Sequence, residues 1–212
     1  MGKEFIELFE QWADSYDNSV YGHDIEYKAV FENYDLILSM VTKLAFGNVI
    51  EFGPGTGNLT EKLLHKGLEV IAFEPSPSMR KLASKKLAGK AEILEGDFLH
   101  FEFRGPVNTI VSSYAFHHLT DTEKAEAITT YGNMLHTGGK IVFADTMYES
   151  VEAYKEAVQE AKEKGFHNLA EDLEREYYTT IPVLKEMLET NNFHANFEKQ
   201  NDFVWIMEGI KQ

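Results

Sequence analysis

The sequence predicts an α/β protein with a doubly wound sheet, in which parallel strands are covered by helices on both faces. Short apolar runs alternate with longer amphipathic segments through the centre of the chain. The runs are apolar almost throughout, as expected of strands that are buried on both faces. A loop with glycine at every second position, three times, follows the first run. Together these observations indicate successive strand–helix–strand units.

The expected elements can be placed in order along the chain. A helix at 24–44 has apolar residues at the i, i+3, i+4, i+7 spacing of a core-facing helix. Ser76 is expected to cap the helix after the second strand, with Pro77 at its first position. The last two strands are joined by Gln200-Asn201-Asp202, which predicts a hairpin. The expected strands are 48–52, 69–73, 91–94, 107–112, 140–144, 193–199 and 203–210. The expected helices are 3–16, 24–44, one that follows the glycine loop and ends at 66, 77–87, 121–135 and 181–191.

We expect residues 1–212 to form one domain, since this length suits a single α/β core. Residues 147–178 interrupt the alternation with two charged amphipathic segments, which predicts a helical insertion acting as a lid. The amphipathic segment 1–22 is expected to act as an N-terminal cap.

The composition restricts the class of function. The formal net charge of −15 opposes nucleic-acid binding, which depends on neutralising phosphates, and favours a neutral or cationic small molecule. The chain has no cysteine, which excludes disulfides, thiolate zinc sites and cysteine nucleophiles. No apolar run approaches the roughly 20 residues of a membrane span. The acidic, amphipathic start is unlike a signal peptide, so we expect a cytoplasmic protein without membrane contact.

The glycine loop predicts a pocket for part of a nucleotide-like ligand. Gly53, Gly55 and Gly57 let the backbone turn sharply between a strand and a helix N-terminus, and they let a ligand approach closely. The spacing matches neither the dinucleotide fingerprint nor the phosphate-binding P-loop. Glu51 would repel phosphates and suits a ligand with a cation or hydroxyl donors. The alternative is an ordinary strand–helix turn.

Acidic residues follow the next two strands, where ligands bind in such sheets. Glu74 can accept hydrogen bonds from both hydroxyls of a ribose; the alternative is a surface acid. Asp97 can accept from the amine of adenine, and the backbone N–H of Phe98 can donate to the ring; the alternative is an Asx turn. Met79 and Leu99 are candidates to enclose the adenine, or else they belong to the core.

Two adjacent histidines, His117 and His118, follow the fourth strand. They are candidates for a base, a metal pair or substrate contacts, and Asp145 after the fifth strand is the nearest partner by topology. Because adjacent side chains do not face the same way, we expect no metal site here.

The chain resembles the class I S-adenosylmethionine-dependent methyltransferases over its whole length. E-F-G-P-G-T-G is similar to the first motif of that family, and Glu74 to its ribose-binding acid. G-D-F, S-S-Y-A-F-H-H-L and G-G-K-I-V-F-A-D are similar to its adenine-binding, strand-four and strand-five motifs. With W-A-D-S-Y-D near the start, the chain more narrowly resembles the YrrT-type methyltransferases of bacilli. The resemblance implies a Rossmann-like sheet of order 3-2-1-4-5-7-6 with strand 7 antiparallel.

The resemblance also implies roles for individual residues toward S-adenosylmethionine. The three loop glycines would approach its methionine part and ribose, Glu74 would bind the ribose, and Asp97 and Phe98 would hold the adenine. Ser113 would lie near the methionine end. Tyr16 would close over the sulfonium, or else it is a core residue.

Methyl transfer from a sulfonium is an in-line displacement that needs a base only if the nucleophile keeps its proton. His117 is the preferred candidate, with His118 second, and both could instead line the pocket or pack. The strand-four segment differs from that of amino-methylating DNA enzymes, and pyrimidine C5 and arsenite methylation rely on cysteines. A small-molecule acceptor is therefore expected. An RNA- or protein-modifying enzyme and a non-catalytic cofactor-binding protein remain alternatives, and a dehydrogenase is disfavoured by the glycine spacing.

Overall fold

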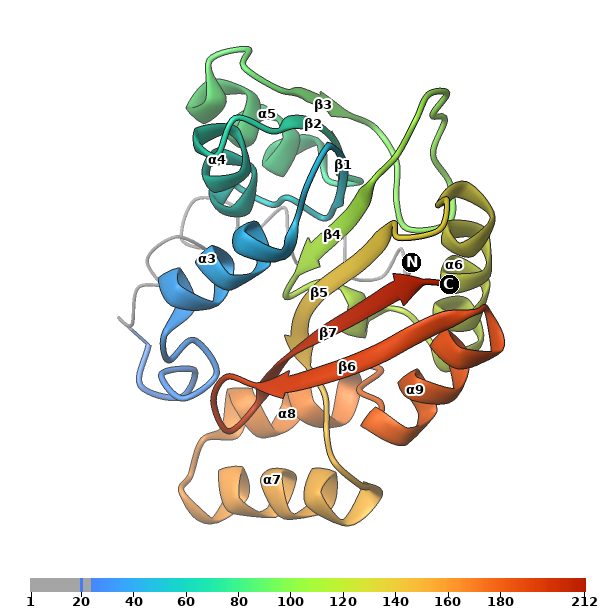
Figure 1. Cartoon of the computed structure of the whole chain (residues 1–212). Helices are drawn as coiled ribbons and strands as arrows, with labels where there is room; N and C mark the ends of the chain where they lie inside the picture. Colours follow the sequence, from blue (N-terminus) through green and yellow to red (C-terminus); the bar gives the residue numbers. More distant parts are fainter. Residues whose placement is uncertain (1–19, 21–23) are drawn as a thin grey trace.

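The computed structural model describes residue 20 and residues 24–212, and the architecture is that of the expected doubly wound sheet (Figure 1). Within this part of the chain seven strands form one sheet in the order β3-β2-β1-β4-β5-β7-β6. Strand β7 runs antiparallel to both neighbours, whereas β1 to β5 pair in parallel. The predicted strand order and antiparallel seventh strand are confirmed. The strands are β1 (Asn48–Phe52), β2 (Glu69–Phe73), β3 (Glu92–Leu94), β4 (Thr109–Ser113), β5 (Lys140–Thr146), β6 (Phe193–Lys199) and β7 (Val204–Lys211).

Helices cover both faces of the sheet (Figure 1). Two helices, α7 and α8, occupy the predicted insertion between β5 and α9. The helices are α3 (Tyr34–Leu44), α4 (Asn58–His65), α5 (Pro77–Leu87), α6 (Asp121–Met134), α7 (Val151–Glu163), α8 (His167–Arg175) and α9 (Ile181–Thr190), with a short 3-10 helix η2 (Phe116–His118). Among the described helices, none combines the length and the apolar character that a membrane crossing requires. The predicted helix at 3–16 and Tyr16 lie outside the described residues.

Successive residues of each central strand enter two separate cores. Val49 and Val111 pack in the core beneath α3, α4 and the insertion. Their chain neighbours Ile50 and Ile110 pack in the opposite core beneath α6 and α9. Because both faces are buried, these strands are apolar without alternation, which is the pattern that predicted a parallel sheet.

Helix starts follow the capping signals of the sequence. The Ser76 hydroxyl accepts from the backbone N–H of Met79, and Pro77 occupies the first position of α5, as predicted. Thr120 and Glu123 form a capping box at the start of α6, where each side chain accepts from the backbone N–H of the other residue.

The prediction of one helix over residues 24–44 is wrong for its first part. Residues 25–33 form successive turns, and α3 begins at Tyr34 after Asn33, whose φ is 62°. The Asn201 amide, on the turn between β6 and β7, donates to the carbonyls of Val30 at 3.1 Å and Glu32 at 2.9 Å. A continuous helix would bond these carbonyls to its own N–H groups four residues on, so a tertiary contact overrides the helical pattern.

Hydrogen bonds between residues far apart in the sequence connect the insertion to residues 24–31. The Glu26 carboxylate accepts from the backbone N–H groups of Asn168 at 2.8 Å and Leu169 at 3.1 Å, at the start of α8. These N–H groups have no partner within the helix, so Glu26 supplies the cap that α8 lacks locally. The Tyr27 hydroxyl also bonds to Asp172 on α8. The insertion and the segment before α3 therefore form one connected cover.

Replacing Asn201 with alanine tests how strongly the early turns are held. Asn201 is buried; its amide donates to two carbonyls, and its oxygen accepts from the backbone N–H groups of Phe203 and Val204. We expect Asn201→Ala to lower the unfolding free energy by about 2–3 kcal/mol, because four hydrogen bonds are lost and their backbone partners stay partly buried. This corresponds to a melting temperature lower by roughly 4–12 °C.

The matched control is Asn196→Ala, which changes an exposed asparagine of β6. Thermal unfolding followed by circular dichroism measures both variants. Equal melting temperatures for the two would show that Asn201 does not hold the early turns.

Candidate functional site

The glycine loop adopts a backbone that only glycine tolerates easily. Gly53, Gly55 and Gly57 have φ of 64°, 56° and 88°. The backbone N–H of Gly53 donates to the Phe73 carbonyl at 2.9 Å, which holds the loop against the end of β2. A Cβ at Gly53 would lie 2.8 Å from the Cβ of Ala115, whereas a Cβ at Gly55 would meet nothing within 4 Å. The loop is therefore packed tightly at Gly53 and open at Gly55.

A cavity lies beside this loop at the carboxyl ends of the strands. It contains five of the residues predicted for cofactor binding, namely Gly53, Gly55, Glu74, Met79 and Ser113. The other lining residues are Tyr34, Pro54, Leu59, Tyr114, Ala115 and His118. Gly57 is outside this lining; a Cβ there would face Leu87 at 3.3 Å, so its missing side chain serves the packing of α4 on α5.

Glu74 is fixed at the wall of the cavity by backbone donors. One carboxylate oxygen accepts from the N–H of Gly55 at 3.0 Å, and the other accepts from the N–H of Ser76 at 2.9 Å. The residue is buried. A carboxylate oxygen has more than one acceptor site, so the two backbone donors do not by themselves prevent Glu74 from accepting ligand hydroxyls.

Glu51 lies in the sheet beneath the loop, outside the cavity lining. It is 1% exposed, and within the described residues neither of its carboxylate oxygens has a hydrogen-bond partner. Burial raises the pKa of Glu51 to about 8. The polar groups of nearby Thr60 oppose this rise in part, and the negative charge of Glu74 adds to it. Glu51 therefore holds a proton at neutral pH in the protein alone, and a nearby positive charge would favour its ionisation.

The residues predicted to hold adenine do not line the cavity. Asp97 forms the Asx turn that was the alternative, since one carboxylate oxygen accepts from the N–H groups of Leu99 at 2.8 Å and His100 at 2.9 Å. The Phe98 ring is buried in an aromatic cluster, with its centroid 5.4 Å from that of Phe52. Leu99 packs at the edge of the same core. In this geometry Asp97 and Phe98 shape the loop after β3.

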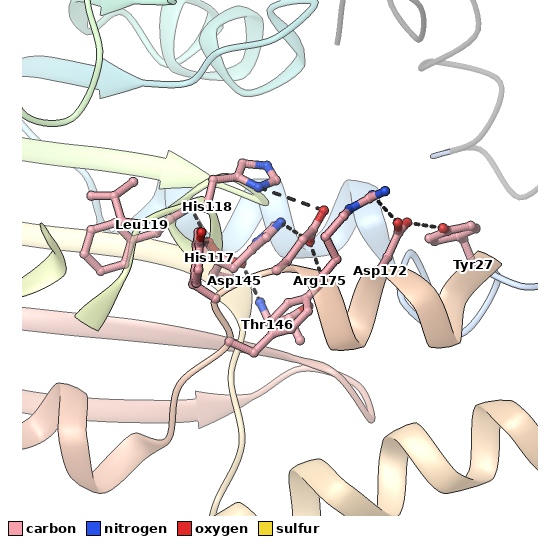
Figure 2. Close-up of polar contacts among 12 residues, drawn as sticks. Tyr27, His117, His118, Leu119, Asp145, Thr146, Asp172 and Arg175 are labelled. Atoms are coloured by element: carbon pink, nitrogen blue, oxygen red, sulfur yellow. Dashed lines mark hydrogen bonds and ion pairs between the residues drawn. The ribbon is translucent and has the colours of Figure 1, made fainter. Parts of the chain in front are cut away.

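His117 lies between two carboxylates and pairs with both. Its Nδ1 lies 2.5 Å from Oδ1 of Asp145 (Figure 2). Its Nε2 lies 3.1 Å from Oε2 of Glu176. Burial alone would lower the pKa of His117, but the two carboxylates outweigh it and raise this pKa to about 10. With both ring nitrogens engaged and the ring positively charged, His117 does not suit the predicted role of general base. The expected partnership with Asp145 is present.

His118 has the opposite character and lines the cavity. Its side chain is 4% exposed. Burial, together with the positive charge of His117, lowers the pKa of His118 to about 3, so this ring is neutral. The two neighbouring histidines are thus driven into different protonation states by their surroundings.

Tyr114 has a strained backbone and an unsatisfied side chain at the end of β4. Its φ is 53°, which is rare for an aromatic residue, and its ring packs between Phe31 and Tyr34 with centroids 5.2 and 5.4 Å away. The Tyr114 hydroxyl is buried with no hydrogen-bond partner among the described residues. Strain of this kind gathers at functional sites. Sequence reasoning assigned Tyr114 no role; its position directly after Ser113 was the available signal.

Comparison with known proteins relates the chain to methyltransferases. Residues 49–139 match the model of a methyltransferase domain family. The chain is 57% identical to an uncharacterized methyltransferase of Geobacillus kaustophilus, covering all of this chain and 99% of that protein. Among solved structures, the magnesium protoporphyrin IX methyltransferase of Synechocystis with bound SAH is similar, with a TM-score of 0.72, 14% identity, and coverage of 97% of this chain and 99% of that one.

The chain belongs to the methyltransferases, and its fold is that of the class I S-adenosylmethionine-dependent enzymes. Within the class it is 56% identical to the uncharacterized methyltransferase YrrT of Bacillus subtilis over the full length of both chains. The prediction of a YrrT-type methyltransferase is confirmed. The class uses S-adenosylmethionine as methyl donor, and the prediction of this cofactor is confirmed.

The buried Glu51 predicts a specific pH dependence of stability. Its pKa rises from 4.5 in the unfolded chain to about 8 in the folded protein. Between these values the unfolded state holds fewer protons, so stability falls as pH rises through this window. We expect the melting temperature of Glu51→Gln to fall less between pH 5 and pH 8 than that of the wild type.

Differential scanning calorimetry without cofactor measures the effect, with Glu69→Gln as control because Glu69 is an exposed carboxylate at the start of β2. Parallel curves for the wild type and Glu51→Gln would contradict a buried, protonated Glu51.

Proposed function

We propose that this enzyme transfers a methyl group from S-adenosylmethionine to a small-molecule acceptor. The observation that carries the proposal is the cover beside the cavity, formed by the insertion and residues 24–31 and joined by Glu26 and α8. Phe31 of this cover packs against Tyr34 and Tyr114, which line the cavity. A small acceptor fits beneath such a cover, whereas RNA or a folded protein needs open access. The net charge of −15 also disfavours RNA. We infer that residues 147–178 act as a lid within a single domain.

The described residues fit the cofactor at the cavity. The open space above Gly55 leaves room for a ligand to pass close to the backbone, and the fixed Glu74 carboxylate suits the two ribose hydroxyls. Met79 is an apolar wall for the adenine, and Ser113 lies on the side of the methionine end. The buried Glu51 beneath the loop favours a cationic ligand. Asp97 and Phe98 support the loop after β3, and their contact with adenine stays a prediction.

The protein residues act mainly by positioning. When bound, S-adenosylmethionine supplies an activated methyl group on a sulfonium. The cavity walls align the acceptor and exclude water, which is the main catalytic requirement of an in-line displacement. The Tyr114 hydroxyl is the group we assign to an oxygen or nitrogen of the acceptor, because it is buried and lines the cavity. The charged His117 holds the turn after β4 in place and takes no proton.

Glu74→Gln tests the assignment of the ribose site. We expect the affinity for S-adenosylhomocysteine to fall by about 1.5–3 kcal/mol, or roughly 10- to 150-fold, because a charged hydrogen-bond acceptor is lost. Isothermal titration calorimetry measures the dissociation constant. The control is Glu95→Gln, since the Glu95 side chain after β3 is 83% exposed. A loss below twofold would remove Glu74 from the ribose site.

The acceptor class is tested with methyl-labelled S-adenosylmethionine. Cell extract is separated into a low-molecular-weight filtrate, RNA and protein, and each fraction is incubated with the enzyme. We expect label in the filtrate, and we expect Tyr114→Phe to reduce this transfer about tenfold, as loss of one hydrogen bond of about 1.4 kcal/mol would do. Tyr114→Phe should change cofactor affinity less than twofold.

Label in the RNA or protein fraction would contradict the small-molecule proposal. Cofactor binding without transfer to any of the three fractions would favour a cofactor-binding protein without turnover.

A further inference from the structure

Three side chains that carry metal-binding atoms converge where the insertion meets the turn after β4. One ligand atom from each of His117, His118 and Glu176 lies within 4.8 Å of the others. The side chains are 11%, 4% and 8% exposed. The expectation that adjacent histidines face apart is wrong here: their ring centroids are 4.1 Å apart, and a ring nitrogen of each approaches the Glu176 carboxylate.

We propose that His117, His118 and Glu176 bind a divalent transition-metal ion, with Zn²⁺ as the best match. Two imidazole nitrogens and one carboxylate oxygen form a ligand set that Zn²⁺ accepts without any cysteine. The donor atoms already lie close together, so small side-chain rotations bring them to metal-binding distances.

The groups around the three ligands orient them as in known metal sites. Asp145 binds Nδ1 of His117 and thereby directs its Nε2 toward Glu176. Asp145 is itself held by the backbone N–H groups of Phe116 at 2.6 Å and Thr146 at 2.7 Å. A carboxylate behind a ligating histidine is the usual way to fix the tautomer and orientation of the ring.

Glu176 is oriented from the side of the insertion. The Tyr178 hydroxyl donates to its Oε2 at 2.7 Å, and the Tyr178 ring stacks on His117 with centroids 5.1 Å apart. The carboxylate is therefore held near both histidines by contacts from its own segment.

The charges of the cluster favour a cation. Asp145 and Glu176 are buried acids facing the two histidines. Lys124 is buried nearby, where its ammonium donates to the carbonyls of Leu119 and Tyr177. In the protein alone the charged His117 and Lys124 balance the two carboxylates. A divalent ion bound at Nε2 of His117 would take the place of the proton that this ring releases.

The ion would connect two segments that are far apart in the sequence. His117 and His118 belong to the turn after β4, whereas Glu176 follows α8 directly. The ion would join the insertion to the wall of the cavity, because His118 lines that cavity. Three protein ligands leave a coordination position open for water or another donor.

Metal titration of the whole chain tests this site. After treatment with a chelator and removal of the chelator, the protein is titrated with ZnCl₂ by calorimetry and with CoCl₂ by visible absorption. We expect one Zn²⁺ per chain and at least tenfold weaker binding by Glu176→Gln, which loses a ligand. The control is Glu174→Gln, because Glu174 is an exposed neighbour paired with Lys162. Its affinity should equal that of the wild type.

Absence of Zn²⁺ binding at 100-fold molar excess, or equal binding by the wild type and Glu176→Gln, overturns the proposal and leaves the cluster as an ion-paired contact. X-ray absorption at the zinc edge of the wild type needs no variant and covers the case in which Glu176→Gln does not fold. Two imidazoles and a carboxylate are expected, and a shell with one imidazole or none contradicts the assignment. Neither measurement depends on methyl transfer, so a failed acceptor assay leaves this test unaffected.

Discussion

The Glu74 carboxylate joins the pieces on which the site depends. It accepts the N–H of Gly55 from the loop after β1 and the N–H of Ser76 from the turn after β2. These two segments come from neighbouring parallel strands, whose carboxyl ends meet at one edge of the sheet. The Gly53 N–H, bonded to the Phe73 carbonyl, strengthens the same junction. One buried acid therefore joins the two loops at the wall of the cavity, and it is the acid that we propose for the ribose.

The strand ends hold several groups in states that the folded protein alone does not favour. Glu51 is buried without a hydrogen bond among the described residues, the Tyr114 hydroxyl is likewise unsatisfied, and the Tyr114 backbone is strained. Each of these costs stability, on the order of 1–3 kcal/mol per group. The surrounding core, with buried apolar residues on both faces of the sheet, supplies that stability. Of these groups, the Tyr114 hydroxyl belongs to a residue that lines the cavity, where we propose that a ligand satisfies it.

Most of the fold follows from local pattern. Apolar runs between capped helices predicted the strands to within two residues at each end, and Ser76 with Pro77 marked the start of α5. The early turns were missed because their geometry depends on Asn201, which lies far along the chain. The motif fixes both residue type and position, and Gly53, Gly55 and Glu74 lie together at the cavity, whereas their roles toward the cofactor stay a prediction. The protonation states of His117 and His118 could not be predicted from the sequence. They depend on Glu176, which the insertion supplies, and on the tight turn η2 that brings the two rings together.

The cap that Glu26 provides for α8 connects residues separated by 142 positions. Forming it closes a chain loop of most of the domain, and the entropy of that closure makes such a contact a late event in folding. The bond between Glu26 and Asn168 is exposed, so this contact opens at lower free energy than the buried sheet. Under the proposed lid role, ligand entry would require local opening of such contacts without unfolding of the domain.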